Sequence, residues 1–192
     1  MFDALRGYIS AYVKFSDNEF KAFTQLLEIR SYDKKAQLTK IGETEKHLNF
    51  VVKGLARKYF IKGKEEIVTH IAKENAIISS TTSFELEMPS NFIVETIEPS
   101  TFISITKENL ELICKQSHKI EHLRRLVITA LFVQKELMEY ERMRLSTRER
   151  FVQYVHTNSD LLQRVPQKYL ASYLNIKPET FSRLKHLLQA KK

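Results

Sequence analysis

The sequence contains a single cysteine, Cys114, and no hydrophobic run that approaches the length of a membrane-spanning helix. One thiol excludes an internal disulfide, a four-cysteine zinc site and an iron–sulfur cluster, and it is typical of a reducing compartment. A bilayer span needs about 20 apolar residues, so we expect no membrane partner. The opening segment MFDALRGYISAYVKF is amphipathic and lacks a small-residue cleavage site, which argues against a signal peptide. We therefore expect a cytoplasmic protein.

Motifs for catalysis are also missing. The sequence has no glycine-rich phosphate loop, no serine or cysteine nucleophile motif and no paired-carboxylate signature. His118, Glu121 and His122 do spell H-x-x-E-H, a zinc-peptidase pattern. However, no pattern places a further acidic ligand, and two histidines one helical turn apart often arise by chance. We expect neither an enzyme nor a bound metal or other cofactor.

Basic residues concentrate in the last quarter of the chain. The net charge is +8, and the 52 residues from Glu141 to Lys192 hold eleven basic and four acidic groups, a local charge of +7. The other 140 residues hold twenty basic and nineteen acidic groups. A nearly neutral body followed by a basic domain is typical of a protein that binds a polyanion such as DNA. A basic surface that only aids solubility is the alternative.

The hydrophobic pattern changes period twice along the chain. Roughly the first 30 residues have helical spacing, with Ser16 as an expected N-cap. Between about Ser31 and Ser104, short runs rich in β-branched and aromatic residues follow one another without an intervening helical pattern. These runs are AQLTKI, HLNFVVKG, LARKYFIKG, EEIVTHIA, FIVETI and TFISIT. Such a series predicts an antiparallel barrel or roll.

Helical spacing returns after Thr106 and continues to about Arg144. One apolar row in this segment is spaced alternately by three and four residues, as in the seam of a coiled coil. Other apolar residues lie on other faces, so the helix must be covered on more than one side. We interpret the row as a twofold-symmetric homodimer interface, with a long helix inside one core as the alternative. The row consists of Leu123, Leu126, Ala130, Val133, Leu137 and Tyr140.

Two short helices joined by a tight turn are predicted between residues 165 and 188. Pro166 and Pro178 each suit the start of a helix, because a proline has its φ already set and no orphan N–H. Asn175 stands where a helix ends in the left-handed conformation, which asparagine tolerates. The apolar stripe of the first helix consists of Leu170, Ala171 and Leu174. This pattern predicts a helix-turn-helix, with an ordinary helical hairpin as the alternative.

The second of these helices divides into an apolar and a polar face, as a recognition helix does. Phe181, Leu184 and Leu188 form the buried side. Arginine can donate two hydrogen bonds to guanine, and glutamate can accept one from the cytosine amino group. The expected base-contacting residues are Glu179, Ser182, Arg183 and His186, and the expected phosphate-contacting residues are Lys168, Lys177, Lys185, Arg148 and Arg150.

The segment PETFSR at residues 178–183 resembles the recognition signature [RVP]-E-T-[VIF]-[GS]-R of the Crp/Fnr family of bacterial transcription regulators. The segment NFVVKG at residues 49–54 is similar to that family's strand-and-glycine motif. The resemblance covers nearly the whole chain, because the family has the same order of roll, long helix and helix-turn-helix. It implies a dimer that reads double-stranded DNA with Glu179, Ser182 and Arg183, and it implies RNA polymerase as a further candidate partner.

The same resemblance implies an effector pocket in the roll, but the residues for cyclic AMP are replaced. Ile78 and Ser79 stand where family members that bind cyclic AMP have Gly-Glu, and Pro89-Ser90 stands where they have Arg-Ser. A cyclic phosphate needs a fixed cation or convergent N–H donors once it leaves water, so cyclic AMP is not expected. The candidate pocket consists of Ile78, Ser79, Ser80, Ser90 and Asn91, and it holds another small molecule or no effector.

The hydroxyl-rich stretch at residues 79–83 is expected to cap a helix, with an anion site as the alternative. Lys177 occupies the expected N-cap of the recognition helix, where serine, threonine, aspartate or asparagine is usual. A phosphate contact would explain the lysine, and tertiary packing that tolerates it is the alternative.

The expected fold is α+β. Residues 1–144 form an antiparallel β-roll of the double-stranded β-helix (jelly-roll) type with flanking helices, ending in a long dimerisation helix over about 107–144. Residues 145–192 form a winged-helix-like helix-turn-helix domain with a short or missing wing. The expected function is a sequence-specific transcription regulator that binds a pseudo-palindromic operator as a homodimer. The alternative is a ligand-binding or protein-interaction module with a vestigial DNA-binding motif, which would bind DNA only weakly and without sequence preference.

Overall fold

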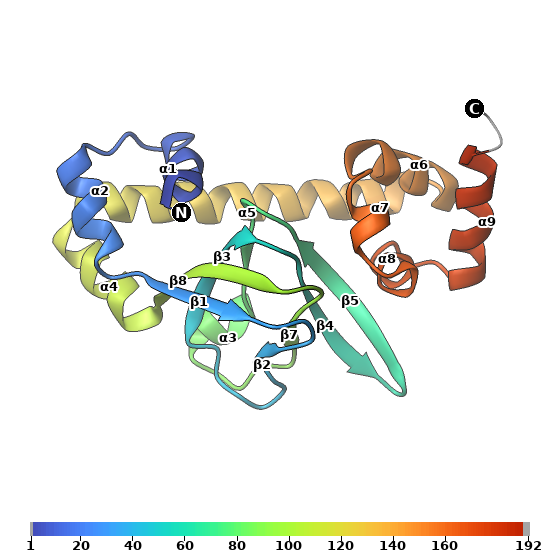
Figure 1. Cartoon of the computed structure of the whole chain (residues 1–192), viewed down its shortest axis with the longest axis horizontal. Helices are drawn as coiled ribbons and strands as arrows, with labels where there is room; N and C mark the ends of the chain where they lie inside the picture. The colour runs from blue at the N-terminus through green and yellow to red at the C-terminus, as the bar shows by residue number, and fades with distance from the viewer. Residues whose placement is uncertain (1, 190–192) are drawn as a thin grey trace. The chain divides into compact units, whose positions relative to one another are not determined.

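The computed structural model, which describes residues 2–189, contains two antiparallel β-sheets and a series of helices (Figure 1). The chain divides into two compact units. Residues 2–60 and 70–130 form the first unit, and residues 61–69 and 131–189 form the second. The predicted α+β class with a β-roll and a helical C-terminal part is confirmed.

The roll consists of two four-stranded sheets, with strand orders β1-β8-β3-β6 and β2-β7-β4-β5. The strands are β1 Glu28–Tyr32, β2 Gln37–Thr39, β3 His47–Lys53, β4 Ala56–Lys62, β5 Glu65–Ala72, β6 Ile77–Ile78, β7 Ile93–Thr96 and β8 Ser100–Thr106. Each of the six predicted runs contains a strand. β1 lies where the helical pattern was expected to end, and its mostly exposed residues gave no apolar alternation. β6 is only two residues long.

The sheet β1-β8-β3-β6 is buried on both faces. Adjacent residues of a strand point to opposite faces, and Phe50 and Ile103 join the core beneath the helices while Val51 and Phe102 join the core between the sheets. All four of these side chains are at most 4% exposed. This double burial explains why the β3 and β8 segments have apolar runs instead of strict alternation.

The helices of the first unit cover the outer face of that sheet. They are α1 Phe2–Ser10, α2 Asp17–Thr24, α3 Thr81–Leu86, α4 Lys107–Gln116 and the first part of α5 His118–Arg144. Figure 1 shows α1, α2 and α4 gathered around the start of α5. Their buried residues form one cluster with Phe50 and Ile103, including Leu5, Ile9, Phe20, Phe23, Phe84, Leu110, Ile113, Ile120 and Leu123.

The predicted continuous helix over 107–144 is wrong in one respect, because it breaks at Ser117. Ser117 has an extended backbone with φ −140° and ψ 106°, and it ends α4. Its carbonyl and hydroxyl oxygens both accept from the N–H of Ile120, at 3.0 and 3.4 Å. Ser117 thus provides partners for an N–H group that the break in the helix would otherwise leave without one. The remaining helix α5 is 27 residues long. Within the described residues, no helix is both long and apolar enough to cross a bilayer.

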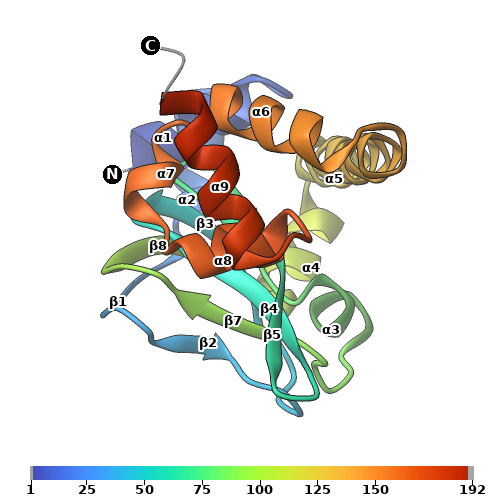
Figure 2. The same cartoon turned by 90° about the vertical axis from the view of Figure 1, so that its right-hand side faces the viewer.

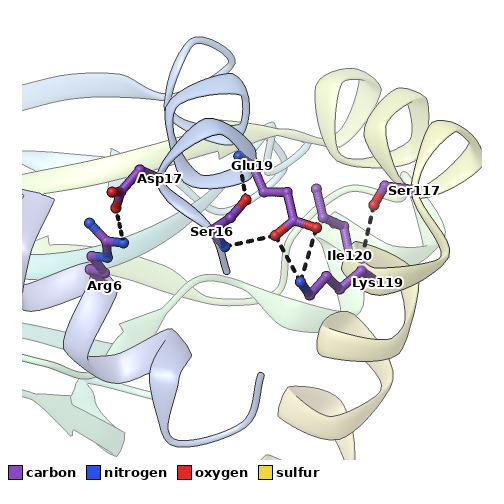
Figure 3. A network of polar contacts seen from close by, with 7 residues as sticks. All are labelled: Arg6, Ser16, Asp17, Glu19, Ser117, Lys119 and Ile120. Carbon is purple, nitrogen blue, oxygen red and sulfur yellow. Dashed lines mark hydrogen bonds and ion pairs between the residues drawn. The ribbon is translucent and has the colours of Figure 1, made fainter. Parts of the chain in front are cut away.

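A polar network ties the beginning of α2 to the beginning of α5 (Figure 3). Ser16 and Glu19 form a capping box, in which the Glu19 carboxylate accepts from the Ser16 N–H at 2.7 Å. The same carboxylate accepts from Lys119 Nζ at 2.8 and 2.9 Å. The hydrogen bond from Lys119, followed by those from Ser16, lowers the pKa of Glu19 from 4.5 to about 2. The predicted N-cap at Ser16 is confirmed.

We predict that Lys119→Met raises the pKa of Glu19 from about 2 toward 4.5. Because the folded-state pKa is lowered, the stability contributed by Glu19 is complete above pH 4.5 and is lost as the pH falls through about 2. Carboxyl-carbon NMR titration measures this pKa directly. Lys115→Met, which removes an exposed lysine of α4, should leave it unchanged. A Glu19 pKa that stays near 2 without Lys119 would contradict the assignment.

Candidate nucleic-acid interface

Four helices follow α5 in the second unit: α6 Thr147–Thr157, α7 Leu161–Arg164, α8 Gln167–Tyr173 and α9 Pro178–Gln189. Ser146 and Glu149 form a second capping box, in which the Glu149 carboxylate accepts from the Ser146 N–H at 2.8 Å. These hydrogen bonds lower the pKa of Glu149. Ser146 thus caps α6, and α9 ends at Gln189, the last described residue, so the predicted short or missing wing lies outside the described residues.

The turn between α8 and α9 is a Schellman motif. Asn175 adopts the left-handed conformation with φ 54°, as its position predicted. Its N–H donates to the Ser172 carbonyl at 3.0 Å, and the Ile176 N–H donates to the Ala171 carbonyl at 3.0 Å. These two bonds satisfy carbonyls that the end of α8 would leave without a partner, and they direct the chain into α9.

The apolar face of α9 is buried against α6 and α8. The Phe181 side chain is fully buried, and its ring meets that of Phe151 edge-to-face with 5.1 Å between centroids. Leu184 is also buried, and Leu170 and Ala171 of α8 are fully buried. Figure 2 shows α9 lying across α8, with α6 beside its far end. The side chain of Leu188, predicted on this face, lies outside the described side chains.

The opposite face of α9 carries the polar residues. Glu179, Arg183 and His186 are exposed, and Ser182 is half-buried. The spacing of these residues places them on one side of the helix, near its N-terminal end. The structure therefore brings the four predicted base-contacting side chains together on one accessible surface.

The cations predicted to meet phosphates differ in their surroundings. Lys168, Lys177 and Arg148 are exposed, and Lys185 is half-buried. Arg150 donates from one terminal nitrogen to the carbonyls of Arg142 and Leu145, at 3.0 and 3.3 Å. It thus covers carbonyl groups at the end of α5, which have no helical partner.

Sequence reasoning missed the contribution of the β4–β5 hairpin to this unit. Residues 61–69 belong to the same unit as α8. The Ser172 hydroxyl accepts from the Val68 N–H at 2.9 Å and donates to the Glu66 carbonyl at 2.9 Å. Ser172 lies 104 positions after Val68 and 106 after Glu66, so no local pattern could have indicated the contact.

The predicted dimer row on α5 is only partly exposed. Leu123 is 6% exposed and belongs to the core of the first unit, and Leu126 and Ala130 are half-buried. Val133, Leu137 and Tyr140 are 49 to 60% exposed. Further exposed apolar side chains lie on another side of the helix, namely Ile128, Phe132 and Met143.

The candidate effector residues lie in the first unit. Ile78, Ser79, Ser80 and Ser90 are each at most 3% exposed, and Asn91 is exposed. The hydroxyl-rich stretch at residues 79–83, which was expected to cap a helix, does supply the N-cap residue of α3, Ser80, but the Ser80 side chain makes no cap hydrogen bond. Its hydroxyl instead pairs with that of Ser90 at 2.7 Å.

No protein-family model matches the sequence, and no curated protein matches it. Solved structures do share its fold. The c-di-GMP-responsive global regulator CLP of Xanthomonas campestris is 18% identical, with a TM-score of 0.67 over 92% of this chain and 93% of that one. FixK2 of Bradyrhizobium japonicum is 16% identical, with a TM-score of 0.69 over 86% and 85%. The catabolite activator protein of Thermus thermophilus is 15% identical, with a TM-score of 0.56 over 94% and 86%. The predicted likeness to Crp/Fnr-type regulators is confirmed for the fold.

We predict that Asn175→Ala destabilises the helix-turn-helix by about 1 kcal/mol, because a Cβ disfavours the left-handed conformation unless a side chain such as asparagine compensates. Asn175→Gly should be neutral or slightly stabilising, since glycine adopts that conformation freely. Urea unfolding followed by circular dichroism measures both. Equal stability of the alanine and glycine variants would show that the turn is not held in this conformation.

Proposed function

We propose that this protein is a transcription regulator that binds DNA sequence-specifically through α9. The observation that carries the proposal is the division of α9, which buries Phe181 and Leu184 while Glu179 and Arg183 stay accessible. The charge of +7 over residues 141–192 supports it, because phosphate attraction supplies much of the affinity of such domains. The similar structures named above as regulators support it as well.

Within this proposal, the accessible face of α9 enters the major groove. Arg183 donates to guanine and Glu179 accepts from a cytosine amino group, while Ser182 and His186 contact neighbouring bases. Lys168, Lys177, Lys185 and Arg148 contact phosphates and set the position of the helix. Arg150 has a smaller part in phosphate binding, because one of its terminal nitrogens is already bonded to two carbonyls.

We infer further that the protein acts as a homodimer paired through α5. Val133, Leu137 and Tyr140 form an exposed apolar row with the spacing of a coiled-coil seam, and an identical row on a second copy would cover it. Half-buried Leu126 and Ala130 extend the row toward the start of the helix. Such a pair would set its recognition helices about 34 Å apart, which matches successive major grooves of a pseudo-palindromic operator.

Selection of bound sequences from a random DNA pool, read by sequencing, tests the proposal. A palindromic consensus with half-sites about one helical turn apart supports a dimeric reader. Recovery of unselected sequences, with binding that disappears at moderate salt, would favour the vestigial alternative, since phosphate contacts alone depend on counterion release.

We predict that Arg183→Ala weakens binding to the selected operator by about 1–3 kcal/mol and relaxes the preference at one base pair. Lys168→Ala is the matched comparison, because it removes one exposed cation of the same unit. It should weaken binding to all sequences alike and reduce the slope of affinity against salt by about one. Titration of operator and scrambled duplexes by fluorescence anisotropy separates the two patterns. If Arg183→Ala weakened both duplexes equally, its base-reading role would be wrong.

We predict that Leu137→Asp produces a monomer, because a charge cannot be buried in an apolar seam without a partner. Leu137 is 58% exposed, so the substitution leaves the fold of one subunit intact. Sedimentation equilibrium measures the association. Lys135→Gln makes the same change in net charge on the opposite side of α5 and should leave the dimer intact. A dimer that survives Leu137→Asp at micromolar concentration would refute this interface.

A further inference from the structure

The candidate effector pocket of the roll already contains an acidic side chain of the chain itself. We propose that the buried carboxylate of Glu45 is a built-in anion that takes the place of an acidic effector and holds helix α3 without a ligand. No anionic nucleotide then switches this protein. That Glu45 fills the pocket does not depend on the proposed function. Only the expected lack of an effect of anions on DNA binding rests on that function.

The loop between β2 and β3 brings Glu45 to this position. Thr44 pairs with Pro89 in an isolated antiparallel bridge. The Gly42 N–H donates to the Ser90 carbonyl at 2.8 Å, and the Ser90 N–H donates to the Glu43 carbonyl at 2.9 Å. These backbone contacts fasten the loop to the segment that the sequence assigned to the pocket. The next residue, Glu45, consequently enters the roll beside the start of α3.

Neutral donors converge on the Glu45 carboxylate, which is 4% exposed as a residue. The Ser80 N–H donates at 3.3 Å, the His47 N–H donates at 3.1 Å, and the Thr39 hydroxyl also donates. The Glu45 N–H in turn donates to Ser83 Oγ at 2.8 Å. Backbone N–H groups and hydroxyls that converge in this way are the kind of donor set that binds a phosphate or carboxylate out of water.

The side chains of the serines around Glu45 make hydrogen bonds of their own. Ser80 and Ser90 pair through their hydroxyls, and Ser83 Oγ donates to the Met88 carbonyl at 2.5 Å. Among the pocket hydroxyls of the described residues, only that of Ser79 lacks a hydrogen-bond partner. One hydroxyl cannot replace the hydration of a phosphate. The buried hydroxyls of the pocket therefore offer no set of free donors for a second anion.

Two cations near α3, Lys107 and Arg124, bind a carboxylate outside the pocket. Lys107 Nζ and Arg124 each donate to the Glu85 carboxylate, at 3.1 and 2.8 Å. Glu85 lies in α3, so these bonds tie that helix to α4 and α5. An incoming phosphate would meet the negative charge of Glu45, and these two cations are already paired with Glu85. The Glu45 carboxylate thus holds the start of α3 through the Ser80 N–H, and Glu85 holds the helix through Lys107 and Arg124.

Calorimetric titration of the purified protein with cyclic AMP, cyclic GMP, cyclic di-GMP and inorganic phosphate tests the first consequence. We expect no saturable binding up to millimolar concentration, and no change in the protein's affinity for its selected operator. Saturable binding of any of these anions at or below millimolar concentration would overturn the proposal.

Glu45→Ala tests the occupation itself, without DNA. Removal of the carboxylate should leave its donors unsatisfied and lower the melting temperature by several degrees. Formate at 100 mM should recover at least half of this loss, because a small carboxylate fits the space that the side chain leaves. The same salt should shift the wild-type protein by less than one degree. Sodium chloride at equal ionic strength controls for screening.

Glu43→Ala is the matched control, since Glu43 lies in the same loop but its exposed carboxylate contacts only Lys40. It should melt near the wild-type temperature and show no response to formate. If Glu45→Ala fails to fold, Glu45→Gln replaces it, with hydrogen exchange of the Ser80 and His47 amides as the readout. Faster exchange of both amides supports the proposal. Unchanged exchange, or stabilisation of all variants alike by formate, would refute it.

Discussion

The arrangement of the first unit depends on burying one sheet from both sides. In β3 and β8, neighbouring residues point in opposite directions, and both directions lead into apolar cores. A sheet of this kind is stable only if another sheet covers one face and helices cover the other. The helices on either side of the roll in sequence, α1 and α2 before it and α4 and α5 after it, supply that second cover. The start of α5 is therefore part of the core, whereas its later residues are not.

The helix-turn-helix is stabilised differently, by the backbone hydrogen bonds of the tight turn between α8 and α9. α8 and α9 are short helices of 7 and 12 residues, and such helices are marginal in isolation. The Schellman turn and the buried ring of Phe181 give α9 a fixed support. With this support, the side of α9 that carries Glu179 and Arg183 stays exposed.

The order of elements could be predicted from the sequence because hydrophobic period is a local property. The left-handed Asn175 and the two capping boxes were predictable for the same reason, since each depends on residues within one turn. The break at Ser117 was not, because a serine that ends a helix carries no signal as strong as proline or glycine. The candidate pocket was located by its alignment with the family's Gly-Glu and Arg-Ser positions, and this alignment did not indicate Glu45. Its burial depends on the pairing of Thr44 with Pro89, which lie 45 positions apart in the chain.

The contact between Ser172 and β5 has a consequence for the behaviour of the protein at high concentration. β5 stands at the end of its strand order, so its outer backbone groups face no further strand of the sheet. Edges of this kind can pair with the edge of another molecule and start aggregation. The hydroxyl of Ser172 engages one N–H and one carbonyl of that edge, and Val68 beside it is 3% exposed. Helix α8 thus also protects a strand edge against association between chains.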